Sequence, residues 1–334
     1  MSTSSSSTGT PATAPLVPIY DIDVLVRAEA EIERDPPVFL IKNRYDRLTR
    51  IPNTIRGYEP QTESYTEATL DGIKAGQLDE LEETTSEKFP KNVVILRNET
   101  DYEEARRNGD EATFCPVTIK KVNVERSNLS VQEVQRIMEL AREGMRQNGE
   151  EAALRIFVRE HLADRAINKV IGFGLGTVSY LPFYHAPNTD YPYAETAPEE
   201  PHFRQHVAAM ILAEELSAVS NTPVELFLQD PEYKKVDTEV LTNYGFCLVG
   251  PAGARGFALI DERSLVLSSC PGFPLRQVLA DMPRPAAVVL NSTSSPDDPE
   301  SSRSRRMMSE YSDEYLDVEP ITSFVDSIWW VRKP

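Results

Sequence analysis

The chain has 334 residues, 53 of them acidic and 35 basic, which gives a formal net charge of -18 at pH 7. That length is enough for one sizeable core with extensions. The negative balance argues against direct nucleic-acid binding, which depends on clustered lysine and arginine.

The first segment, residues 1–15, contains mainly Ser, Thr, Ala and Pro, without a basic or an apolar signal region. We expect a disordered tail there. No later segment approaches the roughly 20 apolar residues of a membrane span. The three cysteines, Cys115, Cys247 and Cys270, are odd in number and widely spaced, which favours a reducing compartment. These features predict a cytoplasmic or nuclear protein that does not associate with membranes.

Residues 16–125 are heterogeneous. Short apolar runs with the composition of strands, such as residues 38–41 and 93–96, are separated by long polar and acidic stretches. Because such stretches supply little apolar surface, we expect a loosely packed accessory region at the N-terminal side of the main domain.

Residues 126–166 carry a clear helical signal. Ser130 and Glu133 have the spacing of a capping box. Apolar residues then recur at helical spacing up to Met145, and Asn148-Gly149 ends that pattern before a second helical run. The sequence predicts a helical linker of two helices that packs on the core.

From residue 167 onward, short apolar runs alternate with helical stretches, which is the pattern of βαβ units with a parallel sheet. The expected strands are Val170–Phe173, Val224–Leu228, Phe246–Val249, Leu265–Ser268 and Ala286–Leu290. The expected helices are Phe203–Ser217, Asp237–Tyr244 and Leu275–Met282. The link from Gly250 to Arg263 is short and glycine-rich, so a strand pair and a tight crossover remain alternatives and the strand order stays open. The fold class predicted for residues 167–334 is a Rossmann-like, doubly wound α/β domain with a mostly parallel sheet.

A polar, serine-rich stretch follows the fifth strand. We expect residues 292–317 to form a disordered insertion, in which the short basic run Arg303, Arg305 and Arg306 is solvated. Residues 324–331 are again apolar and predict a last strand at the sheet edge.

A glycine-rich turn follows the first expected strand. Gly172, Gly174 and Gly176 lack Cβ atoms, which lets the backbone approach a phosphate or a cofactor carboxylate. The dinucleotide-binding pattern needs glycine at position 177, where the chain has Thr177. The spacing is closer to the first motif of S-adenosylmethionine-dependent methyltransferases, which carry an acidic residue upstream where this chain has Val170. Cofactor binding and a merely tight turn remain alternatives.

Two polar residues complete the predicted cofactor site. Asp230 follows the second strand, a position from which a carboxylate accepts hydrogen bonds from a ribose, although a turn residue before Pro231 is the alternative. Gln205 opens the next helix and either donates its amide to a ligand or belongs to the polar face of that helix. The intervening loop, residues 177–202, is rich in aromatic residues and is a candidate lid.

Other motifs give little support for catalysis. His202 and His206 are four apart, but Phe203 stands where a zinc protease has glutamate, so no metal site is predicted. We expect both to be surface or locally hydrogen-bonded histidines. Cys270 follows the fourth strand and is a candidate nucleophile, yet no feature places an activating base beside it. The chain has neither a G-x-S-x-G elbow nor a G-x-x-x-x-G-K-[ST] loop, which argues against hydrolase and P-loop chemistry.

The order of these landmarks resembles the SRR-like domain family (sensitivity to red light reduced) over about half of the chain. The matching positions are Val170 to Gly176, Gln205, Asp230-Pro231, Leu241 with Gly245, Asn291-Ser292, and Phe324 with Asp326 and Ser327. Family members tend to carry Pro-His-Cys after the fourth strand. This chain has Ser269-Cys270-Pro271 and so keeps the cysteine without the histidine.

The resemblance implies a Rossmann-like domain with regulatory roles, such as light signalling and circadian timing in plants, with links elsewhere to transcription, haem metabolism and cytoskeletal or proteasome phenotypes. It implies no established reaction, so whether the protein is an enzyme stays open. Three hypotheses follow: a regulatory protein that binds a nucleotide-like molecule or a protein partner, a methyltransferase-like enzyme that uses S-adenosylmethionine, and a ligand-free scaffold.

Overall fold

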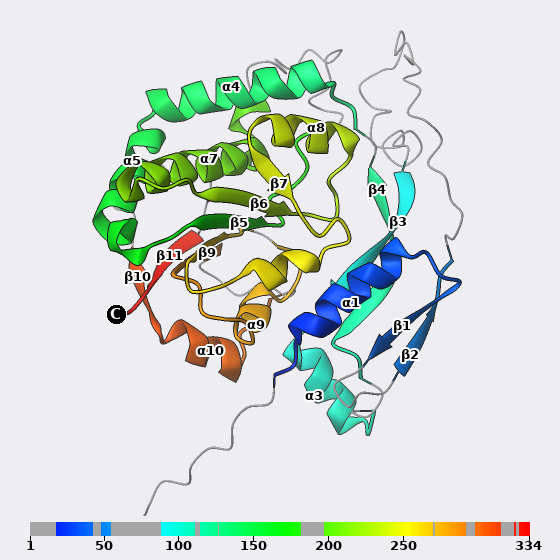
Figure 1. Cartoon of the computed structure of the whole chain (residues 1–334). Helices are drawn as coiled ribbons and strands as arrows, with labels where there is room; N and C mark the ends of the chain where they lie inside the picture. The colour runs from blue at the N-terminus through cyan, green and yellow to red at the C-terminus, as the bar shows by residue number, and fades with distance from the viewer. Residues whose placement is uncertain are drawn as a thin grey trace, which may run out of the picture.

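The computed structural model of the chain describes residues 18–42, 48–54, 88–110, 114–125, 127–181, 197–269, 271–291, 298–314, 324 and 327–334. At its centre is a seven-stranded, mostly parallel sheet with the order β10-β11-β9-β8-β5-β6-β7. Helices lie on both faces of this sheet (Figure 1). The fold is therefore a mixed α/β arrangement, as the alternation of strand and helix patterns predicted.

Five parallel strands form the middle and one side of the sheet. They are β5 (Lys169–Phe173), β6 (Glu225–Gln229), β7 (Phe246–Leu248), β8 (Ser264–Leu267) and β9 (Ala287–Asn291). Every residue of β8 is buried, as expected of a strand covered by helices on both faces. The expected strands are thus confirmed, with bounds shifted by at most one residue.

The chain reverses its direction of travel across the sheet between β5 and β8. It runs outward from β5 to β6 and β7, and then crosses back to β8 and β9 on the other side of β5. The crossing segment contains a short 3-10 helix, η5 (Arg255–Leu259), so it is a tight crossover and not a strand pair. Such a reversal leaves a crevice at the carboxyl ends of the two central strands.

One face of the sheet is covered by α4 (Val131–Gln147), α5 (Glu150–Phe157), α7 (Pro201–Ser220) and α8 (Lys235–Asn243). The π-helix η1 (Val158–Leu162) and the 3-10 helix η2 (Ala163–Arg165) lead from α5 to β5, and the 3-10 helix η4 (Ala197–Glu199) precedes α7. The predicted capping box is confirmed, since Ser130 and Glu133 cap α4 reciprocally. Helix α7 contacts the sheet on one side and α4 and α5 on the other, which explains why it is buried almost all round.

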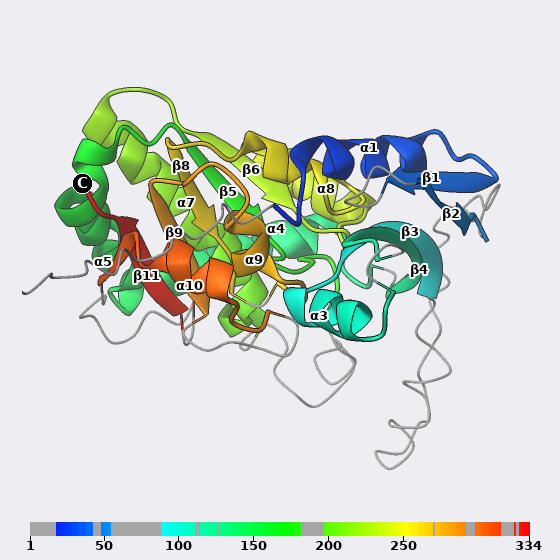
Figure 2. The same cartoon turned by 90° about the horizontal axis from the view of Figure 1, so that it is seen from below.

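The opposite face carries α9 (Leu275–Leu279) and α10 (Ser302–Met308), and the N-terminal elements lie beside them at one end of the sheet strands (Figure 2). The N-terminal elements are α1 (Ile22–Glu33), the pair β1 (Val38–Lys42) and β2 (Leu48–Pro52), β3 (Lys88–Leu96), α3 (Glu99–Arg107) and β4 (Val117–Glu125). Strands β3 and β4 pair antiparallel over nine residues each and are called the β3–β4 ribbon below.

The N-terminal elements share a hydrophobic core with the sheet. Leu25 of α1, Phe39 of β1 and Val94 of β3 belong to the same buried cluster as Ile171 and Phe173 of β5. The expectation of a loosely packed accessory region is therefore wrong. The reason is that enough of its few apolar residues, such as those of α1, β1 and β3 named above, are buried against the sheet domain.

Residues 298–314 differ from the expected disordered insertion. They form α10 and the strand β10 (Tyr311–Glu314), which pairs antiparallel with β11 (Ser327–Arg332). Arg303, expected in solvent, is 5% exposed and pairs with Asp281 at 2.9 Å. Asp281 also accepts the N–H groups of Ile19 and Tyr20, so this segment helps to fix the N-terminal elements.

In the part of the chain that the structure describes, no helix is both long and apolar enough to span a membrane.

Candidate functional site

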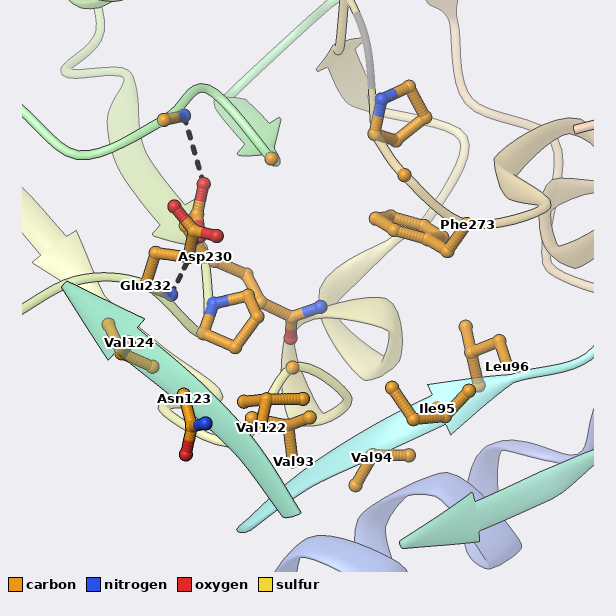
Figure 3. Close-up of a pocket in the computed structure, with 17 residues that line it drawn as sticks. Val93, Val94, Ile95, Leu96, Val122, Asn123, Val124, Asp230, Glu232 and Phe273 are labelled. Atoms are coloured by element: carbon orange, nitrogen blue, oxygen red, sulfur yellow. Dashed lines mark hydrogen bonds between the residues drawn. The ribbon is translucent and has the colours of Figure 1, made fainter. Parts of the chain in front are cut away.

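A pocket of about 370 Å³ lies at the carboxyl edge of the sheet, between the strand ends and the β3–β4 ribbon (Figure 3). Its position follows from the reversal at β5 and β8, because the loops after β5, β6 and β8 diverge there. The lining residues are Val93, Val94, Ile95, Leu96, Val122, Asn123, Val124, Gly174, Gly176, Gln229, Asp230, Pro231, Glu232, Gly253, Pro271, Gly272 and Phe273. This volume is within the range of small-molecule sites in proteins.

The ribbon is held over the sheet edge by two polar contacts. The N–H of Val94 donates to the carbonyl of Ala252 at 2.8 Å, and Nζ of Lys91 donates to the carbonyl of Pro231 at 2.6 Å. Because both acceptors belong to loops at the sheet edge, one wall of the pocket comes from the N-terminal elements and the other from the sheet domain.

The glycine turn after β5 has a backbone that demands glycine at two positions. Gly174 and Gly176 have φ of +61° and +84°, and a Cβ at either one would lie 3.1 Å from Pro271 or His202. A Cβ at Gly172 would come within 2.8 Å of side-chain atoms of Leu175 and Leu228. Tight packing thus accounts for all three glycines, and two of them also line the pocket.

Asp230 braces the glycine turn from the end of β6. Its carboxylate accepts the N–H of Gly176 at 2.9 Å and the N–H of Glu232 at 2.8 Å (Figure 3). Burial raises the pKa of Asp230 from 3.8 to about 6, because the two N–H donors only partly offset the cost of removing the charge from water. At pH 7 the group is still mainly ionised, and it places a negative charge on the pocket wall.

Lys91 is the residue of the ribbon whose charge interacts with that of Asp230. Burial lowers the pKa of Lys91, whereas Asp230 and Glu29 raise it. In the strand register, Lys91 pairs with Val122, which lines the pocket. The side chains of Lys91 and Val122 therefore share one face of the ribbon. The ammonium of Lys91 lies at the edge of the pocket, where it donates to the carbonyl of Pro231.

Gln229 fixes the loop that enters the pocket from β7. Its Oε1 accepts the N–H of Gly256 at 2.5 Å, and the side chain is 3% exposed. A Cβ at Gly250 would lie 2.2 Å from the same oxygen, which explains glycine there. Gly253 of this loop reaches the pocket as a consequence.

The structure brings together three of the five residues predicted for cofactor binding. Gly174, Gly176 and Asp230 line the pocket side by side, whereas Gly172 is packed inside β5. Gln205 is 7% exposed on α7 and is not a lining residue. Cys270, the candidate nucleophile, lies outside the residues that the structure describes, although its neighbour Pro271 lines the pocket.

Sequence reasoning missed the ribbon wall and Phe273. Val93, Val122 and Val124 share one face of the ribbon by register, while Val94 and Ile119 belong to the other face and enter the core. A partial signal lay in β4, where apolar residues alternate with polar ones, whereas most apolar residues of β3 form one continuous run. Which strands pair in the ribbon, and that the ribbon lies over the sheet edge, depend on tertiary contacts that leave no signal in the local sequence.

His206 lies inside the domain behind this site. Its ring nitrogens contact the carbonyl of His202 at 2.5 Å and the hydroxyl of Tyr233 at 2.8 Å, and the side chain is fully buried. Of the two expected alternatives, a surface or a locally hydrogen-bonded histidine, the structure shows the second for His206. Burial lowers the pKa of His206 from 6.5 to about 4.

The lowered pKa of His206 predicts a loss of stability in acid. Between pH 6.5 and 4 the unfolded chain binds a proton at this ring and the folded chain does not, so the free energy of unfolding falls as pH falls. The full effect is on the order of 3 kcal/mol. Urea unfolding at pH 7 and pH 4.5 should show His206→Gln losing less stability in acid than the natural chain. An NMR titration that places the midpoint of His206 near 6.5 would refute this account.

Among the residues with described positions, no group of three or more His, Cys, Asp or Glu side chains is arranged to hold a metal ion. Comparison with known protein families matches residues 130–327, more than half of the chain, to the SRR1 domain. The resemblance to the SRR-like domain family is thus confirmed. Comparisons with curated proteins and with solved structures give no significant match. The matched range contains Gly174, Gly176 and Asp230 but not the β3–β4 ribbon.

Proposed function

Because the chain belongs to the SRR1 domain family, we propose that it is a regulatory protein of the cytoplasm or nucleus whose carboxyl-edge pocket binds a nucleotide-like small molecule. The observation that carries the proposal is the coincidence of this pocket with the reversal point of the sheet. In open α/β sheets, ligands bind outside the carboxyl ends of the strands at such a point.

The strand order supports a Rossmann-like reading. The parallel block β7-β6-β5-β8-β9 has the order 3-2-1-4-5 when its strands are numbered along the chain, as in dinucleotide-binding folds. The glycine turn after the first of these strands and Asp230 after the second occupy the positions that hold a cofactor in such folds. Phe273 and the valines of the ribbon add apolar surface suited to the faces of a base.

A methyltransferase-like enzyme is the second candidate. The carboxylates of Asp230 and Glu232 on the pocket wall favour a ligand with a positive charge, and S-adenosylmethionine carries a sulfonium group. Transfer of a methyl group needs an acceptor, so this reading requires turnover in addition to binding.

The test is a ligand screen on the purified chain with a blocked pocket as comparison. Thermal shift and calorimetry would use S-adenosylmethionine, S-adenosylhomocysteine, NAD(H), NADP(H), haem, and common nucleosides and nucleotides. Ligand at a hundred times its Kd adds about 2.7 kcal/mol to the free energy of unfolding. We expect at least one ligand to stabilise the natural chain and to lose that effect in Val122→Phe, because the larger ring fills the pocket from the ribbon.

Lys121→Phe is the matched control, since Lys121 precedes Val122 on β4, is exposed and does not line the pocket. It should keep the response of the natural chain. An absence of any response across the panel would favour the ligand-free scaffold, and a response that survives in Val122→Phe would place the site elsewhere.

A further inference from the structure

The charges on the pocket wall are all of one sign. Among the described residues that line the pocket, the ionisable side chains are those of Asp230 and Glu232. Asp230 is 6% exposed, whereas Glu232 is exposed and borders the solvent. The negative charges of Glu232 and Asp237 both act on Asp230 and favour its protonated form. A second anion placed here is therefore repelled by charges already present.

Two lysines lie near this wall without lining the pocket, and the charge of Lys91 is attracted to that of Asp230. Nζ of Lys91 donates to the carbonyl of Pro231 at 2.6 Å, and burial lowers its pKa. Nζ of Lys234 donates to the hydroxyl of Thr177 at 3.2 Å and lies over the ring of Tyr180. Both ammonium groups already have an oxygen acceptor, and neither lysine is among the lining residues.

The N–H groups that hold a phosphate in many glycine turns are also engaged. The N–H of Gly176 donates to Asp230, and that of Gly174 donates to the carbonyl of Gln229 at 3.0 Å. Asp230 thus takes the place at the turn that the oxygen of a phosphate takes in nucleotide sites. What the pocket still offers is carboxylate oxygens, which accept hydrogen bonds from hydroxyl and amino groups.

The remaining surface suits a flat ring. Gly174 and Gly176 present backbone without side chains on the sheet side, and Val93 and Val122 present branched apolar side chains on the ribbon side. Phe273 lies at the far end of the pocket from Asp230 (Figure 3). A ligand with apolar ring faces and hydrogen-bond donors at one end matches this distribution.

We infer that the pocket selects nucleosides without phosphate, including the sulfonium nucleoside S-adenosylmethionine, and rejects their phosphorylated counterparts. Ribose hydroxyls or an amino group donate to Asp230, and the base lies between the glycine turn and the ribbon. This inference rests on the proposed function and narrows its ligand to one chemical class.

The experiment compares each nucleoside with its own 5′-monophosphate by calorimetry on the full chain at pH 7.5. Adenosine, guanosine, cytidine and uridine are paired with their monophosphates, and S-adenosylmethionine is titrated separately. The best nucleoside should bind at least roughly tenfold more tightly than its monophosphate, because the phosphate adds a like charge to the pocket. Asp230→Asn should bring the two affinities to within about threefold of each other.

Two further variants keep the comparison sound. Glu232→Gln removes the second lining carboxylate at an exposed position where the fold tolerates it, and it should also reduce the preference for the nucleoside. Glu225→Gln removes an exposed carboxylate at the opposite end of β6 and should leave the preference unchanged. A monophosphate that binds as tightly as its nucleoside overturns the inference while the proposed function stands. Failure of every nucleoside and nucleotide to bind overturns both.

Discussion

Replacing Glu29 with alanine is expected to lower the free energy of unfolding by about 4 kcal/mol. Glu29 lies on α1 and is fully buried, and its carboxylate accepts three backbone N–H groups of the loop after β7. The donors are Ala252 at 3.0 Å, Ala254 at 3.2 Å and Arg255 at 2.5 Å. Without the carboxylate these groups lose their acceptor in a buried place, and each costs roughly 1–3 kcal/mol.

Chemical denaturation of the natural chain and the variant measures this loss. Glu29→Gln keeps one acceptor oxygen and should lose roughly half as much. Glu31→Ala is the matched control on the same helix, because Glu31 pairs with the exposed Arg34 three residues on and should matter by less than about 0.5 kcal/mol. A loss below about 1 kcal/mol in Glu29→Ala would show that the loop does not depend on this carboxylate.

Arg204→Met is expected to destabilise the chain by roughly 3–5 kcal/mol. Arg204 lies on α7 with no exposed side-chain surface and pairs with Glu150, which is equally buried, at 2.5 Å. It also pairs with Glu199. The loss comes mainly from Glu150, whose charge stays buried without its partner.

A double-mutant cycle separates this cause from lost packing. Glu150→Leu combined with Arg204→Met should recover most of the stability lost in Arg204→Met, because no unpaired charge then remains. Arg142→Met removes a partly exposed arginine that pairs with Glu214 and should cost about 0.5 kcal/mol. If the double variant loses the sum of the two single losses, the stranded charge is not the cause.

Much of the sheet was predictable because parallel strands buried on both faces are continuous apolar runs. β8 and β9 are examples, and their expected bounds agree with the structure within one residue. β10 was not predictable, because its sequence Tyr-Ser-Asp-Glu is polar. It adopts the strand conformation because it pairs with β11. Arg303 shows the same limit, since a basic residue in a serine-rich stretch gives no sign of a buried partner.

The candidate site was predicted on one side and not on the other. Gly174, Gly176 and Asp230 follow consecutive strands, so local pattern and the geometry of parallel sheets place them at one edge. The ribbon wall depends on contacts across long sequence distances, such as Val94 to Ala252. Gln205 was predicted at the site and is not there. Its position near the start of a helix predicts a place near the sheet edge, but it does not predict the direction of the side chain.

The shared core also bears on how the chain is made. Ile19 and the carboxylate of Asp281, to which its N–H donates, are 262 positions apart. At roughly 5–20 residues per second, a ribosome needs roughly 10–50 s to synthesise the stretch between them. The elements α1 and the ribbon are made before the first strand of the sheet, β5, which begins at Lys169. Until the central strands are complete, their apolar faces are open to chaperones and to other nascent chains. The yield of folded protein in a cell should therefore depend on chaperone capacity during synthesis more than its stability alone would indicate.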